Sequence, residues 1–188
     1  MFELTLIDHL RLTFGHVVYR HKAHTHLAWS RSRLSRWLRV AEALLMIGVL
    51  ITALAAAFGN GRGYMVLSAV LAGFALVPLV IHLTIDLDGS AQVHAACASA
   101  LWPMRERYRA VMSDLRDGAI DIETARRQRD LLIEQLHAIY ENAPPAEAHA
   151  YQKAAEAVAV ANEPPLTDEE IDLFLPKSLQ KAGKSATA

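Results

Sequence analysis

The sequence predicts an all-α membrane protein, in which an N-terminal amphipathic helix leads into a two-helix transmembrane hairpin and a cytoplasmic helical bundle follows. Three observations predict this class. Two long runs without any charge are separated only by a glycine-rich loop at residues 59–63. The mean hydropathy of +0.17 is high for a chain with 21% charged residues, so the apolar residues must be concentrated. Outside the two runs, apolar residues recur at helical spacing.

Composition excludes several classes of protein. The chain has 188 residues, which allows one domain of ordinary size. Its 19 basic and 20 acidic residues nearly cancel, so it lacks the bulk charge of a nucleic-acid binder, and no nucleic-acid partner is expected. A single cysteine, Cys97, rules out a disulfide framework within the chain and favours a reducing, cytosol-facing environment.

The first segment, residues 1–39, is predicted to be cytoplasmic and helical. Its apolar residues Ile7, Leu10, Phe14, Val17 and Val18 recur at helical spacing. A basic stretch follows, in which Arg31, Arg33, Arg36 and Arg39 alternate with Leu34, Trp37 and Leu38. This pattern is typical of an interfacial anchor that meets anionic lipid headgroups. The nearby membrane already accounts for the arginines, so a nucleic-acid patch is disfavoured.

Residues 40–86 are predicted to form the transmembrane hairpin, with helices at about residues 40–59 and 63–85. At about 1.5 Å per residue, the uncharged runs 43–61 and 63–85 reach roughly 28 and 34 Å, enough to cross a hydrocarbon core of about 30 Å. Both runs are apolar on every face, whereas a helix of a soluble bundle keeps a polar stripe. Seven basic residues precede the hairpin and only Arg62 lies in its loop. The positive-inside rule therefore predicts a multi-pass protein of the inner (cytoplasmic) membrane with both termini in the cytoplasm.

Two sets of hairpin residues are candidates for function. Small residues at four-residue spacing predict close helix packing, either within one hairpin or between subunits; they include Gly48, Ala56, Ala69 and Gly73. Two helices cannot enclose an aqueous path, so a channel would need several copies. The candidate pore-lining residues are Thr52, Ser68, His82 and Thr84. His82 lies near the cytoplasmic end, so an interfacial position without a pore role is the favoured alternative for it.

The cytoplasmic region, residues 87–162, is predicted to be a helical bundle. The first helix covers residues 90–116, with an apolar row at Tyr108, Val111, Met112 and Leu115. Asp121 is a predicted N-cap for the second, whose stripe is Leu132, Ile133, Leu136, Ile139 and Tyr140. A third helix is expected after Pro144 and Pro145, with Tyr151, Ala154, Ala155 and Val158 along one side.

The last segment, residues 163–188, is predicted to be an acidic linker, a short helix and a disordered tail. Thr167 and Glu170 form a capping-box pattern before Ile171, Leu173 and Phe174, which predicts an amphipathic helix from Thr167 to Leu175. This helix could dock on the chain's own bundle or on a partner.

Chemistry-bearing side chains are sparse. The cluster His21, His24 and His26 lacks an acidic or cysteine supplement, which disfavours a metal site. His94 and Cys97 share a predicted helix face, but a structural cysteine is the favoured interpretation. We therefore predict no catalytic residues, no metal and no cofactor, and a protein that is not an enzyme.

The order of parts resembles a known family. After the hairpin come Gly89-Ser-Ala-x-x-His94, the segment Trp102–Tyr108, Ile139-Tyr-Glu-Asn-Ala-Pro144 and Ala150-Tyr-Gln-Lys-Ala154. Over roughly residues 10–162 this resembles the SLATT family, the SMODS- and SLOG-associating two-transmembrane effector domains of bacterial conflict systems. The resemblance implies a membrane effector of antiviral defence and abortive infection that forms pores or perturbs the bilayer. It implies no catalytic motif, and a nucleotide-dependent sensor as the trigger.

Two functions follow as hypotheses. In the first, the chain forms a homo-oligomeric pore or perturbs the inner membrane, triggered by a separate nucleotide-synthesising or nucleotide-sensing protein. Polar-to-leucine changes at Thr52, Ser68 or Thr84 would then abolish toxicity without preventing insertion. In the second, the chain is a membrane-anchored adaptor or scaffold whose bundle and acidic tail bind a partner. Those changes would then be silent, whereas Leu173→Asp or Phe174→Asp would abolish function.

Overall fold

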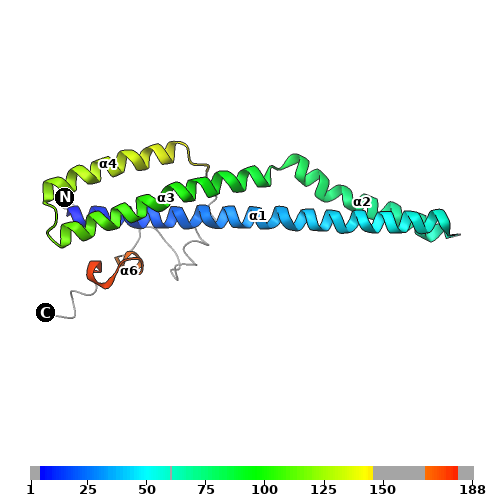
Figure 1. Ribbon diagram of the computed structural model, residues 1–188, viewed down its shortest axis with the longest axis horizontal. Coiled ribbons are helices and arrows are strands. Elements are labelled where there is room, and N and C mark those ends of the chain that lie inside the picture. The colour runs from blue at the N-terminus through cyan, green and yellow to red at the C-terminus, as the bar shows by residue number, and fades with distance from the viewer. Residues whose placement is uncertain (1–4, 60, 146–167, 182–188) are drawn as a thin grey trace. The chain divides into compact units, whose positions relative to one another are not determined.

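The computed structural model describes residues 5–59, 61–145 and 168–181, and these are all helix, turn or short connection, without a strand. The helices are α1 (Leu6–Phe58), α2 (Arg62–Thr84), α3 (Leu87–Arg116), α4 (Ile122–Glu141), the short α6 (Asp168–Asp172) and a 3₁₀ turn at Lys177–Leu179 (Figure 1). The chain divides into two compact units. Unit 1 comprises Met1–Leu27 and Val93–Ala188, and unit 2 comprises Ala28–Gln92. The predicted all-α class, with an apolar two-helix hairpin and a helical bundle, is confirmed.

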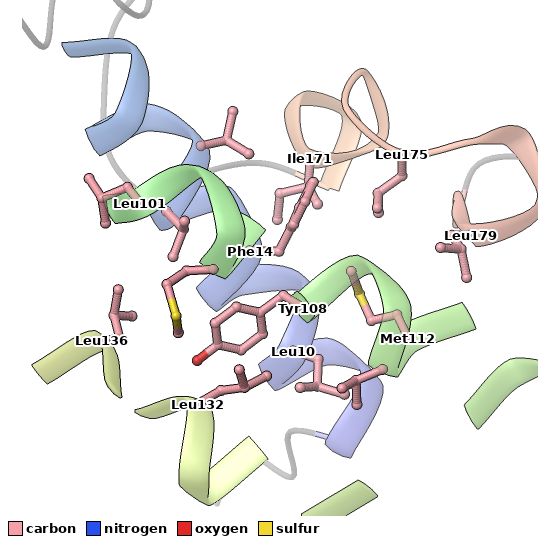
Figure 2. Close-up of a cluster of buried hydrophobic side chains, with 14 of the residues drawn as sticks. Leu10, Phe14, Leu101, Tyr108, Met112, Leu132, Leu136, Ile171, Leu175 and Leu179 are labelled. Carbon is pink, nitrogen blue, oxygen red and sulfur yellow. The ribbon is translucent and has the colours of Figure 1, made fainter. Parts of the chain in front are cut away.

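The core of unit 1 forms between the start of α1 and the end of α3. The predicted α1 stripe is buried: Leu10, Phe14, Val17 and Val18 have no exposed surface. Tyr108 and Met112 on α3 are equally buried and belong to the same cluster. Figure 2 shows Leu10, Phe14, Tyr108 and Met112 converging, with the Tyr108 ring directed toward α4. Burial of one apolar stripe per helix is what spacings of three and four residues produce.

Helix α4 covers a second side of this core (Figures 1 and 2). Gly118, with a φ of 71°, allows the turn between α3 and α4 because only glycine adopts this conformation without a Cβ penalty. The predicted N-cap is confirmed, since the Asp121 carboxylate accepts a hydrogen bond of 2.6 Å from the Thr124 amide. Leu132 and Leu136 are buried, while Ile133 remains exposed at the edge of the stripe.

The C-terminal segment docks on the chain's own bundle. Ile171, Leu175 and Leu179 are buried in the same cluster as Phe14, beside which Figure 2 shows Ile171. This placement on the same chain is the first of the two alternatives that the sequence left open for the short helix. Leu173 points away and is 63% exposed. The prediction of a disordered tail over the last dozen residues, 177–188, is wrong for its first part, because Lys177–Leu179 form a 3₁₀ turn and Leu179 is buried. The short helix ends at Asp172 rather than at the predicted Leu175. The predicted capping residue Thr167, the third helix expected after Pro145 and residues 182–188 lie outside the described residues.

Helix boundaries differ from the sequence-based ones in two places. Helix α1 runs through the expected boundary at residues 39 and 40 as one helix. The second apolar helix, in contrast, is not continuous with the helix that follows. Ile85 is extended, with φ −123° and ψ 110°, and the Asp86 carboxylate accepts a hydrogen bond of 2.8 Å from the Gly89 amide. Asp86 thus caps α3, which begins at Leu87 rather than at residue 90.

Candidate functional site

The candidate site is the apolar hairpin of unit 2, formed by the end of α1 and by α2, which runs back along it (Figure 1). Both helices are long and apolar enough, by length and composition, to cross a membrane. Large apolar side chains cover the outside of the pair, among them Leu44, Ile47, Leu50, Ile51 and Leu54 on α1 and Val70, Phe74, Leu76, Val77 and Val80 on α2, all exposed. An apolar surface of this extent requires lipid or further protein to cover it.

The two helices meet along a seam that we define by Gly48, Thr52, Ser68, Ala75 and Pro78. A Cβ on Gly48 would lie 3.3 Å from Leu71 Cδ1, so the absence of a side chain permits the close approach of α2. Thr52 is buried and its hydroxyl donates to the Gly48 carbonyl at 2.8 Å. The Ser68 hydroxyl donates across the seam to the Val49 carbonyl at 3.5 Å. Ala75 and Pro78 are buried as well.

The remaining candidate residues of the hairpin lie away from the seam or at its end. Ala69 and Gly73 are exposed, and a Cβ on Gly73 would meet nothing within 4 Å, whereas Ala56 is half-buried. Thr84 is exposed and donates to the Val80 carbonyl at 2.7 Å. His82 lies at the end of the seam, with Nδ1 4.0 Å from a Glu42 carboxylate oxygen. Whether any of these residues lines a pore stays a prediction.

Four arginines form a basic collar at the base of the hairpin, comprising Arg31, Arg33, Arg36 and Arg39. Arg39 holds the Asp88 carboxylate through both oxygens, at 3.0 and 3.1 Å. Arg31 donates to Ser90, and Arg33 lies over the Trp29 ring at 5.1 Å. Trp29 and Trp37 are exposed among them. Exposed tryptophan beside arginine is typical of the membrane interface. The sequence did not reveal that Asp88 and Ser90 pair with this collar.

Two histidines meet within unit 1. His24 and His94 are buried, with their Nδ1 atoms 2.9 Å apart. At this distance one ring donates to the other, which requires at least one of them to be neutral. Burial, then the neighbouring His94 and then Arg20 lower the pKa of His24 to about 4. His24 is therefore a buried neutral ring that is hydrogen-bonded to His94 within unit 1.

Neither a metal centre nor an activated nucleophile is assembled in the described part of the chain. Within residues 5–59, 61–145 and 168–181, no group of three or more His, Cys, Asp or Glu side chains is placed to hold a metal ion. Burial raises the pKa of the Cys97 thiol, against a smaller opposing effect of Arg20. A reactive thiol needs the opposite shift. Cys97 instead lies in the core cluster.

Acidification is expected to destabilise unit 1 through His24. The unfolded chain takes up the proton as the pH falls below about 6.5, whereas folded His24 resists protonation down to about pH 4. The free energy of unfolding should therefore fall by about 3 kcal/mol between these limits, with full stability above pH 6.5. Urea unfolding of the detergent-solubilised chain at a series of pH values measures this. His24→Asn should reduce this pH dependence but leave part of it, because burial also lowers the pKa of His16 and of His21. The matched change His137→Asn, at an exposed histidine, should leave the profile unchanged.

Comparison with known proteins gives one match. The profile of the family described as "SMODS and SLOG-associating 2TM effector domain family 4" matches residues 6–170, which include the hairpin, the collar and the whole of α3 and α4. No curated protein and no solved structure was found to match the chain. The match covers most of the chain and agrees with the two apolar helices, so the chain belongs to the SLATT family, as a member of its family 4 of two-transmembrane effector domains.

Proposed function

We propose that several copies of the chain assemble in the inner membrane of a bacterial cell and form a pore or perturb the bilayer, as an effector of antiviral defence. The family's description as an effector domain supports a role in a conflict system. The trigger would be a separate nucleotide-synthesising or nucleotide-sensing protein, since the family is described as associating with SMODS and SLOG. The outcome would be arrest or death of the infected cell.

The polarity of the seam is the observation that carries this proposal. Outside the seam the hairpin surface is almost wholly apolar, while Thr52 and Ser68 lie in the seam and the Glu42–His82 pair lies at its end. In one copy both hydroxyls are bound to carbonyls of α1, so a single hairpin offers no aqueous path. Copies that turn their seams toward a common axis would gather these groups around it. Exposed Ala69 and Gly73 would let neighbouring helices approach closely.

The proposed orientation rests on the collar. Its arginines precede the first apolar run, and Arg62 is the single charge in the loop at the far end of the hairpin. Arginine beside exposed tryptophan favours the interface of the cytoplasmic leaflet, whose lipids are anionic. Both termini would then be cytoplasmic, and the lipid bilayer would be the first partner of the chain.

Removal of the seam hydroxyls is expected to abolish depolarisation. Thr52→Val with Ser68→Ala keeps the packing of the seam but deletes both polar groups, whereas leucine would not fit at the buried Thr52. In cells that express the chain together with its sensor, the wild type should depolarise the membrane. The double variant should do so at least tenfold more slowly at equal membrane levels, as reported by a potential-sensitive dye.

The matched control is Ala53→Val with Ala57→Val, which adds apolar bulk at two exposed positions of α1. This control should depolarise like the wild type. Depolarisation by the Thr52/Ser68 variant at the wild-type rate would show that the seam does not line the conducting path. A wild type that never depolarises, even with the sensor present, would contradict conduction altogether.

One observation favours the adaptor as a second candidate. Leu173 is 63% exposed on the docked C-terminal segment, next to the half-buried Phe174. An exposed leucine in the turn that follows this short acidic helix can contact a partner protein. Under this function the seam variants are silent, whereas Leu173→Asp abolishes activity without undocking the segment.

A further inference from the structure

A buried arginine on α1 takes its partners from the far end of the chain. Arg11 is only 2% exposed and lies between the buried Leu10 and Phe14. Its guanidinium donates to Asp172 at 2.6 Å, to the Leu179 carbonyl at 2.5 Å and to Asp168 at 3.3 Å. Within the part of the chain that the structure describes, every hydrogen-bond and ion-pair partner of this guanidinium comes from residues 168–181. A charge that is buried this deeply requires such partners.

Residues 168–181, which we call the C-terminal clip, form a compact ligand for Arg11. The Asp172 carboxylate also accepts the Lys181 amide at 3.0 Å. The Gln180 side chain donates to the Asp172 and Leu175 carbonyls at 2.7 and 2.8 Å, which closes the clip on itself. Lys181 pairs with Asp168 at 3.1 Å and with Asp8 on α1. Hydrogen bonds within the clip therefore hold its backbone in the conformation that contacts Arg11.

The surface beneath the clip is a specific acceptor, which we call the Arg11 groove and define by Asp8, Leu10, Arg11 and Phe14. It combines apolar surface with one buried cation and one carboxylate. The Arg11 groove is therefore complementary to a short helix that has two carboxylates at four-residue spacing, apolar residues beside them and a lysine after them. The clip has this pattern in Asp168, Asp172, Ile171, Leu175 and Lys181.

We propose that, in the assembled effector, the clip of one copy seats in the Arg11 groove of a second copy. This inference rests on the proposed assembly of several copies. The contacts of an exchanged clip are identical to those within one copy, so exchange needs no new surface. More residues separate the end of α4 at Glu141 from the clip than α4 itself contains, so the number of residues does not restrict the clip to its own copy. Confinement of the copies to one membrane raises their effective concentration.

The family match includes one side of this contact and only the beginning of the other. It ends at residue 170, within α6, so Ile171, Asp172, Leu175 and Leu179 lie beyond the shared domain, whereas Arg11 lies inside it. The hairpins cannot drive association by hydrophobic burial, because lipid tails are as apolar as leucine. The clip and the Arg11 groove lie outside the hairpin. Their contact combines buried apolar side chains, an ion pair and hydrogen bonds.

Chemical cross-linking between two differently tagged copies tests the exchange. In a Cys97→Ser background, one copy carries Asp8→Cys and the other Lys181→Cys, the two positions that form an ion pair. A thiol-specific bis-maleimide with a spacer as long as the lost lysine side chain is added to isolated membranes, and exchange yields a cross-linked pair bearing both tags. A single chain that carries both cysteines should give a mixture of internal and intermolecular cross-links. If it gives only internal cross-links, and the two single-cysteine copies give no linked pair at equal levels, the clip docks within its own copy and the inference is wrong.

A charge exchange supplies the matched control. Arg11→Asp in the Asp8→Cys copy should lower the linked pair at least tenfold, because two carboxylates then face each other. Asp172→Arg in the Lys181→Cys copy should restore it, since the charges are again opposite. Absence of this rescue, with both copies present in the membrane, would contradict recognition by Arg11. The cross-linking is read without depolarisation, so linked copies that never conduct would overturn the pore and leave the exchange standing.

Discussion

Two arginines in the middle of α2 are expected to remove the chain from the membrane. Gly73→Arg and Leu76→Arg both point away from α1, because a Cβ on Gly73 meets nothing within 4 Å and Leu76 is 58% exposed. They therefore leave the seam intact. Each arginine at the centre of a membrane span costs about 2.5–3.5 kcal/mol. A penalty of roughly 6 kcal/mol should shift most of the chain to the carbonate-soluble fraction.

The same two charges near the hairpin loop are the matched control. Gly63 also has open space around its Cβ, and Val66 is exposed, but both lie in the first turns of α2. Arginines there reach the headgroups with their long side chains, so Gly63→Arg with Val66→Arg should remain carbonate-resistant. Equal extraction of both variants would contradict a transmembrane α2. A hairpin that is covered by protein instead of lipid would not distinguish depth in this way.

Local spacing explains which parts of unit 1 were predictable. The α1 stripe with Phe14, the α3 row with Tyr108 and the α4 stripe with Leu132 are all buried. Each helix is polar on one side, so the spacing of apolar residues over a few consecutive turns predicts which side faces the core. The N-cap at Asp121 is local for the same reason, since its partner Thr124 lies three residues away.

The long-range contacts could not be read from the sequence. Arg11 is separated from Asp172 by 161 residues, and His24 from His94 by 70. Nothing in the neighbourhood of Arg11 marks it as buried, because an arginine on an amphipathic helix is ordinarily exposed. The position of the seam could not be predicted for a related reason. A helix that is apolar on every face has no sequence pattern that shows which side contacts the neighbouring helix. Thr52 and Ser68 could therefore be identified as candidates, but the sequence did not show whether they face the other helix of the hairpin.

The unbroken α1 shows that a change in composition does not by itself end a helix. The change from a basic to an apolar stretch near residue 40 predicts a new segment, yet the helix continues through it. No glycine or proline occurs between Gly15 and Gly48, so nothing in the backbone ends the helix there. At residues 85 and 86, by contrast, the Asp86 cap starts a new helix although the spacing of apolar residues is uninterrupted.

Loss of the Asp172 carboxylate is expected to release the C-terminal clip. Asp172→Leu leaves the guanidinium of Arg11 buried with only the Leu179 carbonyl and the more distant Asp168. Breaking a buried ion pair on one side costs about 3–5 kcal/mol. The clip can escape this cost by undocking, which returns Arg11 to water. Hydrogen exchange of the amides of residues 171–180 should therefore accelerate at least a hundredfold, while α3 and α4 keep their protection.

Replacement of both partners separates the lost charge from the lost packing. Arg11→Met with Asp172→Leu removes the cation together with the anion, so the buried site becomes apolar and the clip should dock again, with exchange close to that of the wild type. Asp168→Leu is the matched single change, because Asp168 contacts the same guanidinium at 3.3 Å but is half exposed, and exposed pairs contribute less than about 1 kcal/mol. If the double variant exchanges as fast as Asp172→Leu alone, the clip is held by the shape of the Asp172 side chain and its bond to the Lys181 amide rather than by neutralisation of Arg11.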